Sequence, residues 1–282
     1  IPYFWHEPYW DRYERLMQEV ARRYDGHPRV LDVIDSGCSA IYAETWYRAH
    51  ADLGSNTRLW NAGLNGAVDL TAHERSMSIM NATFTTTRIG HSINAWDKIV
   101  DPATDADGRS PDWPSVRLFL EARYLEMGPK LVIMNNGQGP SSNCLVGQSE
   151  LGKFFCYMDR VSAEGKPTGY QTDEYQRIGG TPEACYEALD AALELGACFV
   201  ELPGFTSLPP GMDPAILQAY DAQLKANAPT GAEVGSWHTF GAQWSPTAIS
   251  WSLDGLEKHS VAATLNEPMY VALNLAVGGE FA

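Results

Sequence analysis

Two glutamates stand where a carboxyl group would be chemically active. Glu44 lies between Tyr42 and Trp46 in the segment SGCSAIYAETWYR, and Glu201 interrupts the apolar run of FVELPG. Aromatic surroundings raise the pKa of a carboxyl group, as a general acid requires. A charge inside an apolar run is costly unless it is paired, so Glu201 has either a structural ion pair or a catalytic role. For Glu44, the alternative is a solvated loop carboxylate.

Further polar and aromatic side chains follow segments that look like strand ends. The segment TGYQTDEYQ contains Asp173 and Glu174, and we rank Glu174 equal to Glu201 as one member of a carboxyl pair. Amides bind hydroxyl groups and indole rings stack on sugar rings. The candidate substrate-binding residues are Trp46, Asn94, Trp96, Asn136 and Gln171. The alternative is that the amides cap loops and that Trp96 fills the core; for Trp96 both readings stay open.

The sequence lacks the motifs of several other kinds of functional site. The histidines show no metal-ligand spacing, and His91 is expected in the core, so no metal site is predicted. No Gly-x-Gly-x-x-Gly or Walker motif follows a strand, so no cofactor is predicted. Of the five cysteines, Cys185 and Cys198 fall in apolar stretches and are expected to be inert core thiols. Cys144 and Cys156 flank a loop and could pair, although the odd cysteine count does not favour a disulfide framework.

Charge and composition exclude some partners. Twenty basic and 35 acidic residues give a net charge of −15, which disfavours nucleic acid and anionic membrane surfaces. No apolar run approaches the roughly 20 residues of a membrane-spanning helix. Aromatic residues make up 11% of the 282 residues, including 9 Trp and 13 Tyr, which favours either a large core or sugar-stacking surfaces. Nothing in the sequence specifies the oligomeric state.

Apolar periodicity predicts strands that alternate with helices along most of the chain. Helices are expected over residues 6–24, 69–84, 116–127, 148–159, 181–195 and 213–227. Strands are expected over residues 30–34, 87–93, 131–134, 168–171 and 199–202. This alternation predicts an α/β fold with a parallel sheet, and the polar residues after the strand ends favour a TIM-type (β/α) barrel over a doubly wound sheet. Asp69 is expected to cap the second helix, and residues 101–114 to form a loop.

The pattern changes after Pro229. Strand-like segments cover residues 237–244, 249–253, 256–261 and 269–277, and Asp254-Gly255 is a hairpin signal. We therefore predict two parts: a (β/α)-barrel domain over 1–229, incomplete at its N-terminus, and a short antiparallel β extension over 230–282. Residues 1–5 are expected to be the end of a strand whose beginning lies upstream of Ile1.

The first part resembles the C-terminal portion of a clan A TIM-barrel glycoside hydrolase. The resemblance rests on IPYFWHEPYWDRYERLMQEVARRYDGHPRV: an aromatic strand end, a helix that ends in Arg-Tyr-Asp-Gly, and the next strand. It implies that these residues are the end of strand three, its helix and the start of strand four, that strands five to eight follow, and that strands one, two and most of three are missing. It also implies that Glu44 is the acid/base after strand four, with Glu201 or Glu174 as the nucleophile of a two-carboxylate mechanism.

The tail resembles part of the jelly roll of a family 16 endo-β-glucanase, of the laminarinase type. The segments SWHTFGAQWSPTAISWSLDGLEKHSV and PMYVALNLAVGG carry this resemblance. The catalytic Glu-x-Asp-x-x-Glu motif of that family is absent, so the tail is expected to have no hydrolytic centre of its own.

These observations predict a glycoside hydrolase that acts on a β-glucan-like polysaccharide or oligosaccharide. The carbohydrate is the expected partner, and a secreted or periplasmic location is expected. The alternatives are a carbohydrate-binding protein without catalysis and an inactive fragment of such an enzyme.

Overall fold

A computed structural model describes residues 3–27, 30–38, 53–93, 96–106, 108–140, 144, 150–202, 211–227, 240–244, 248–253, 256–262 and 275–276. The helices are α1 (Glu7–Tyr24), α2 (Leu53–Asn61), α3 (Gly66–Thr83), α4 (Trp113–Met127), the short 3-10 helix η1 (Gly128–Lys130), α5 (Glu150–Ala163), α6 (Pro182–Glu194) and α7 (Pro214–Asn227). The strands are β1 (Asp32–Ile34), β2 (Arg88–Ile93), β3 (Asp97–Ile99), β4 (Arg109–Pro111), β5 (Leu131–Gln138), β6 (Thr168–Thr172), β7 (Phe199–Glu201), β8 (Phe240–Trp244), β9 (Ala248–Leu253), β10 (Leu256–Ala262) and β11 (Leu275–Ala276).

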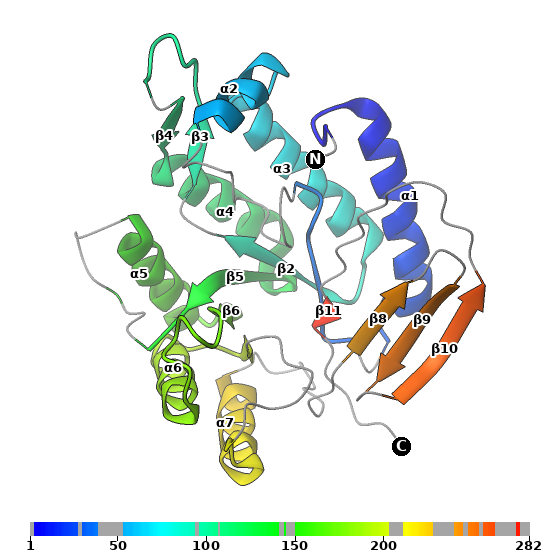
Figure 1. Cartoon of the computed structure of the whole chain (residues 1–282), viewed down its shortest axis with the longest axis vertical. Helices are drawn as coiled ribbons and strands as arrows, with labels where there is room; N and C mark the ends of the chain where they lie inside the picture. Colours follow the sequence, from blue (N-terminus) through cyan, green and yellow to red (C-terminus); the bar gives the residue numbers. More distant parts are fainter. Residues whose placement is uncertain are drawn as a thin grey trace.

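Five parallel strands form the centre of the molecule, in the spatial order β1-β2-β5-β6-β7 (Figure 1). This order is also their order along the chain. A doubly wound sheet reverses its order at a switch point, whereas right-handed crossovers that always advance in one direction place their helices on one face and curl the sheet toward a barrel. The fold is therefore α/β, a partial (β/α) barrel, as the sequence predicts.

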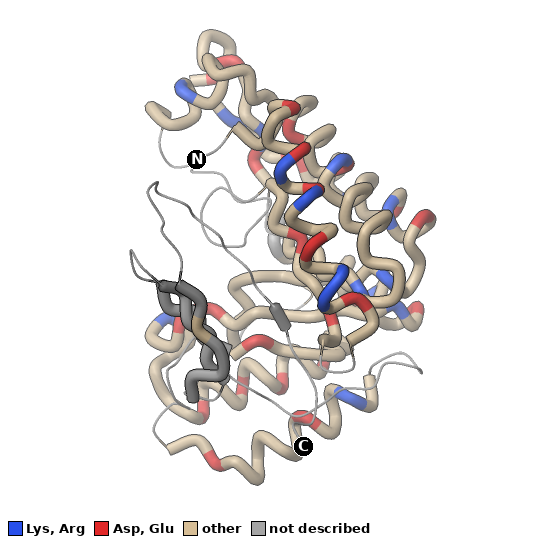
Figure 2. Tube along the Cα trace, turned by 90° about the vertical axis from the view of Figure 1, so that its right-hand side faces the viewer, with Lys and Arg blue, Asp and Glu red and all other residues tan. Residues whose placement is uncertain are grey.

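The two faces of this sheet bury different side chains. On the outer face, Ile89, Ile133 and Val200 share one large apolar cluster with residues of α1, α3, α4, α5 and α6. A smaller cluster packs on the inner face and consists of Ile34, Val132, Met134, Cys198 and Phe199. Charged residues lie along the helices around the outside (Figure 2). Because the apolar inner cluster occupies the middle of the inner face, polar residues on this face lie near the strand ends.

Glycine makes room for the inner cluster. A Cβ atom at Gly169 would come 2.3 Å from the Phe199 ring, and one at Gly90 would come 2.6 Å from Met134 Sδ. At the amino-terminal ends of β1 and β2, Arg88 donates hydrogen bonds to both carboxylate oxygens of buried Asp32, at 2.7 and 3.1 Å. The amino-terminal end of the inner face is therefore closed by a forked ion pair.

Local capping sets several helix boundaries. Thr181 caps α6 through a hydrogen bond from the Ala184 N–H (3.2 Å), as predicted. The cap of α3 is Asn65, whose side chain accepts from two backbone N–H groups, and not the predicted Asp69. Asp69 instead lies inside the helix and is fully buried.

Three further predictions differ from the structure. Residues 3–5 form a turn before α1 and not a strand end. Residues 53–61 form α2, which the sequence did not indicate because only Asn56 is buried and no apolar stripe marks the helix. Inside the predicted loop, Arg109–Pro111 pairs with Asp97–Ile99 as the two-stranded β3–β4 sheet.

The C-terminal strands are antiparallel, as predicted. β8, β9 and β10 form a three-stranded sheet, and the β9–β10 pairing begins at Leu253↔Leu256, on either side of the predicted hairpin turn. β11 pairs with β1 and extends the central sheet by one antiparallel strand. The division of the chain at residues 229/230 stays a prediction. None of the described helices is long and apolar enough to span a membrane.

Candidate functional site

A row of polar residues crosses the inner face at the carboxyl ends of the central strands. Asn136 of β5 is directly opposite Gln171 of β6, which is directly opposite Glu201 of β7. Residues paired in register on parallel strands point to the same side of the sheet. Because Met134 and Phe199 precede Asn136 and Glu201 by two residues and belong to the inner cluster, the row also lies on the inner face. In a (β/α) barrel, catalytic groups collect at this end of the strands.

Ser92 of β2 extends the row to a fourth strand. Its hydroxyl group donates to Asn136 Oδ1 in a short hydrogen bond, and both side chains are buried. The sequence analysis missed Ser92; the available signal was a single small polar residue two positions before Asn94 in the apolar strand RIGHSI. We call Ser92, Asn136, Gln171 and Glu201 the inner row.

Glu201 is the carboxyl group of the inner row. Its side chain is largely buried and accepts a hydrogen bond from the Gln171 amide. Burial raises the pKa of Glu201 above its ordinary value of 4.5, and the hydrogen bond from Gln171 offsets only part of that effect. A neutral amide cannot compensate a buried charge as a cation does. The geometry therefore favours the protonated form of this carboxyl group.

The other predicted carboxyl groups do not join this row in the described structure. Glu174 is exposed in the turn after β6, where its carboxylate lies 3.6 Å from Arg177. Its neighbour Asp173 accepts a hydrogen bond from the Glu174 N–H at 2.7 Å. Glu44 lies outside the described residues, so no distance joins it to Glu201.

Trp96 lies away from the inner row. It is 3% exposed, and its indole N–H donates to Asp69 Oδ2 of α3 at 3.2 Å. This contact places Trp96 among the helices of the outer face, which agrees with the core alternative. The predicted binding residues Trp46 and Asn94 lie outside the described part of the chain.

A second buried polar cluster lies on the outer face between β1, β2 and helices α1 and α3. Asp35 accepts hydrogen bonds from Ser76 Oγ, from the Tyr13 hydroxyl (3.0 Å) and from the Gly37 N–H (3.0 Å). His91 Nδ1 lies 3.1 Å from the second oxygen of Asp35. A carboxylate only accepts, so this nitrogen carries the proton. We call these residues the outer cluster.

The pKa of Asp35 in the outer cluster is shifted in the opposite direction to that of Glu201. Burial alone would raise the pKa of Asp35, but hydrogen bonds from His91, Ser76 and the Gly37 N–H hold the pKa below its ordinary value. His91 is fully buried, as the sequence predicts for a core residue. No local pattern in the sequence indicates its partner, because Asp35 and His91 are 56 positions apart and the β1–β2 pairing brings them together.

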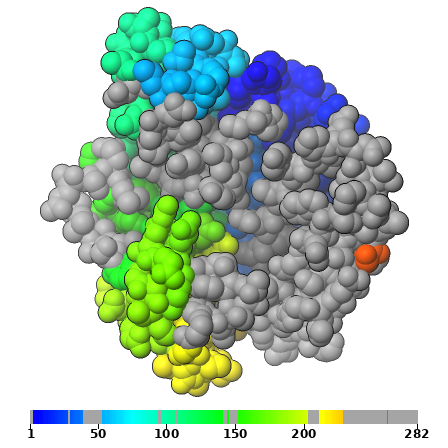
Figure 3. Space-filling model, viewed as in Figure 1, coloured from blue at the N-terminus to red at the C-terminus, as the bar shows by residue number. Residues whose placement is uncertain are grey.

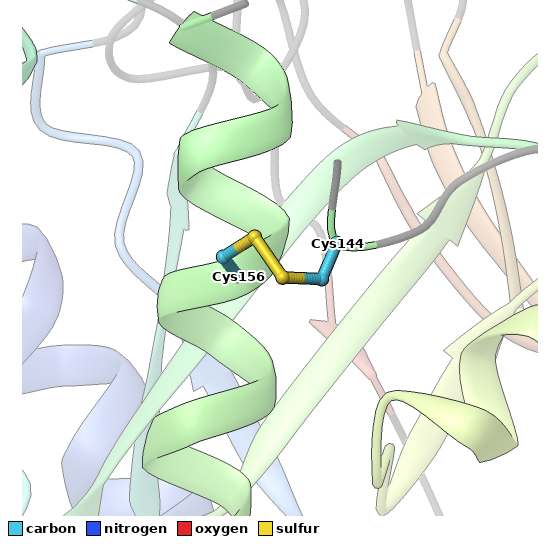
Figure 4. Close-up of a disulfide and its surroundings, with 2 residues drawn as sticks. All are labelled: Cys144 and Cys156. Atoms are coloured by element: carbon cyan, nitrogen blue, oxygen red, sulfur yellow. A yellow bond between two sulfur atoms is a disulfide. The ribbon is translucent and has the colours of Figure 1, made fainter. Parts of the chain in front are cut away.

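The described residues contain no cluster of His, Cys, Asp or Glu able to hold a metal ion. Cys144 and Cys156 form a disulfide that ties residue 144 to α5 (Figure 4). The remaining thiols, Cys38, Cys185 and Cys198, are buried. The pairing left open by the sequence is therefore present, and Cys185 and Cys198 are core thiols as predicted.

Comparisons with known proteins add no evidence for a function. No protein-family model and no curated protein matches the chain. Among solved structures, the chain is similar to the catalytic domain of beta-amylase from Paenibacillus polymyxa, with 13% sequence identity and a TM-score of 0.30. The match covers 79% of this chain and 51% of the other, so the chain spans about half the length of that domain. At this TM-score, the fold class rests on the strand order alone, and the family 16 resemblance of the tail stays a prediction.

Proposed function

We propose that this chain hydrolyses O-glycosidic bonds in a β-glucan-like polysaccharide or oligosaccharide. One observation carries the proposal: a partly buried carboxyl group with a raised pKa, Glu201, lies at the carboxyl ends of the parallel strands, in a row of neutral hydrogen-bonding groups. Perturbed titratable groups in such positions are candidates for catalysis. The Ser92, Asn136 and Gln171 side chains are uncharged donors and acceptors, which match the hydroxyl groups of a neutral sugar.

In this proposal Glu201 is the proton donor to the leaving oxygen. A general acid must hold a proton that it can donate, and burial shifts Glu201 toward its protonated form by raising its pKa. From the resemblance, the acid role is expected for Glu44 and the nucleophile role for Glu201 or Glu174; the raised pKa of Glu201 supports the reverse. Glu44 then supplies the ionised second carboxyl group, and Trp46 and Asn94 stay proposed substrate contacts.

Turnover measurements with two glutamine variants test this role. Glu201→Gln is expected to lose activity on β-glucans by about 10²–10⁴-fold, the usual effect of removing a general acid. It should keep much more activity on aryl glycosides, because a good leaving group needs little protonation. Glu174→Gln is the matched control: the same chemical change at an exposed position should leave both rates unchanged. Full β-glucan activity in Glu201→Gln would exclude Glu201 as the acid.

A carbohydrate-binding protein without catalysis is the second candidate. The inner row favours it, because glycoside hydrolysis uses two carboxyl groups and Glu201 is the one carboxyl group among the four residues of the row. Calorimetry with cello- and laminari-oligosaccharides then shows binding that Asn136→Ala weakens, while no β-glucan or aryl glycoside is turned over. Absence of both binding and turnover would contradict both candidates and favour the inactive fragment.

A secreted or periplasmic location is also proposed. The Cys144–Cys156 disulfide supports it, because disulfides persist in oxidising compartments and are rare in the cytosol. Thiol alkylation of the protein in its native cells tests this: labelling of Cys144 and Cys156 without prior reduction would count against the proposal.

A further inference from the structure

A surface cavity of about 550 Å³ lies on the helix side of the molecule, apart from the inner row. It opens where the end of α2, the start of α3, β3 and the start of α4 meet, and its residues include none of the inner row. The region of α2 and the β3–β4 sheet that borders it is at the top of Figures 1 and 3. Its volume falls in the range typical of small-molecule sites.

The wall of this cavity combines an aromatic surface with polar groups. Trp60, Leu70 and Ile99 are among its apolar residues, and Lys98, Thr104 and Asp112 are among its polar residues. Trp60 is half-buried at the end of α2. Its indole N–H makes no hydrogen bond to a described residue. The cavity thus offers an apolar surface beside hydrogen-bonding groups.

Lys98, the cation among the residues that line the cavity, is paired with a carboxylate. Lys98 Nζ lies 2.8 Å from Asp112 Oδ2, and Asp112 Oδ1 accepts from the Ser115 N–H at 3.2 Å. Although burial acts in the opposite direction, these hydrogen bonds lower the pKa of Asp112 and keep it ionised. Asp101 lies in a turn, and its carboxylate accepts a hydrogen bond from the Ala103 N–H at 2.9 Å. An anionic ligand would therefore find no unpaired cation among the residues that line the cavity.

Close packing fixes the ion pair in place. A Cβ atom at Gly66 would come 2.9 Å from Lys98 Cβ, so the aliphatic part of Lys98 lies directly against the first turn of α3. Asp112 is held by its role as the cap of α4. The polar side of the cavity is therefore built from groups with fixed positions and is not a set of free surface side chains.

We propose that this cavity binds a neutral saccharide, one or two sugar units long, at a site separate from the inner row. A sugar ring has an apolar C–H face, which fits Trp60, and a rim of uncharged hydroxyl groups, which fits the paired Lys98 and Asp112 and the Thr104 hydroxyl. This site does not depend on catalysis at Glu201.

Two-dimensional NMR of the tryptophan indole N–H groups tests the site in the full chain. Cellobiose and laminaribiose are titrated into wild type and Glu201→Gln, with cellobionate as a charged probe and cyclohexanol as an apolar one. The Trp60 signal, identified by its loss in Trp60→Phe, is expected to shift saturably with both disaccharides and with the same Kd in the two proteins. Cellobionate and cyclohexanol are expected to bind more weakly.

Three further variants show whether the signal arises in the cavity. Trp60→Ala should weaken binding roughly tenfold, as expected for loss of an aromatic contact. In this variant, binding is measured on the other indole signals that respond to the sugar. Thr104→Arg, an exposed change at the rim, should block the cavity without altering the core. Tyr24→Ala removes an exposed aromatic residue of α1 and should leave Kd unchanged.

Specific results would overturn the proposal. These are no saturable shift of Trp60, an unchanged Kd in both Trp60→Ala and Thr104→Arg, or equal binding of cyclohexanol. Loss of binding in Glu201→Gln would assign the sugar to the inner row instead. A protein without any turnover that still binds disaccharide at Trp60 would contradict hydrolysis while supporting this site.

Discussion

Two carboxyl groups of this protein, the buried Asp35 and the partly buried Glu201, lie on opposite faces of the same sheet and have opposite pKa shifts. Asp35 in the outer cluster accepts hydrogen bonds from Tyr13, Ser76 and the Gly37 N–H, and His91 contacts its other oxygen. Glu201 in the inner row has a neutral amide as its hydrogen-bond donor. The pKa is lowered at Asp35 and raised at Glu201.

This difference separates a structural carboxylate from a candidate catalytic one. A buried charge that is fully hydrogen-bonded joins elements together, here β1 and β2 with α1 and α3. A buried carboxyl group with incomplete compensation lowers stability in its ionised form, and such groups are retained where chemistry needs them. Isosteric amide variants of the two residues should therefore change stability in opposite directions.

The largest effect is expected for Asp35→Asn. The new amide keeps the shape but loses the charge and sets an N–H group against donors such as Tyr13 and Ser76. The free energy of unfolding should fall by about 3 kcal/mol, in the range for breaking a buried charged network. Urea denaturation measures it; a loss below about 0.5 kcal/mol would show that the outer cluster does not hold the helices to the sheet.

Glu201→Gln should raise the free energy of unfolding, the opposite of the effect of Asp35→Asn. A group whose folded-state pKa is raised stabilises the fold below its unfolded-state pKa, and this contribution is lost as pH rises through the folded-state value. Raising the pH from 4 to 7 therefore removes stability at Glu201, and glutamine, which does not titrate, should add about 1 kcal/mol at pH 7, a typical gain at a functional site. Denaturation at pH 4 and pH 7 checks this, with a smaller gain at pH 4. A destabilised Glu201→Gln at pH 7 would remove the contrast with Asp35.

Asp25 extends the comparison to the surface. Its carboxylate accepts hydrogen bonds from the backbone of Thr85, Thr86 and Thr87 and from the Thr85 hydroxyl, at 2.7–3.0 Å. Although burial acts in the opposite direction, these bonds lower its pKa from 3.8 to about 2. The resulting stability is complete above pH ~4 and is lost as pH falls toward 2.

For Asp25→Asn, solvent screening reduces the expected loss at neutral pH to roughly 1 kcal/mol. The loss should shrink as pH falls toward 2, where a growing fraction of the wild-type carboxyl group is protonated. Thermal unfolding followed between pH 2 and 7 measures the difference, and a pH-independent difference would show that the hydrogen bonds do not depend on the charge.

The smallest effect is expected for Glu174→Gln. Its ion pair with Arg177 is exposed, and such pairs contribute within about 0.5 kcal/mol. Denaturant midpoints of the variant and wild type should agree. A larger change would mean that the turn after β6 stabilises the neighbouring inner row.

The sequence predicts the sheet better than the site. Runs such as Leu131–Met134 and Phe199–Glu201 mark strands by local composition, and their alternation with helices determines the parallel topology. The alignment of Asn136, Gln171 and Glu201 depends on register between strands, which no local pattern encodes. Trp96 shows the same limit: its neighbours in sequence suggest a strand-end position, but its contact is Asp69 of α3.

The most direct test is a carbon-13 NMR titration of the carboxyl groups of Asp35 and Glu201 in the folded protein, with Asp35→Asn and Glu201→Gln used to assign the signals. We expect Glu201 to titrate above 4.5 and Asp35 below 3.8. We also expect Gln171→Leu to raise the pKa of Glu201 further and to leave the pKa of Asp35 unchanged. A Glu201 pKa at or below 4.5 would contradict the assignment of Glu201 as the proton donor.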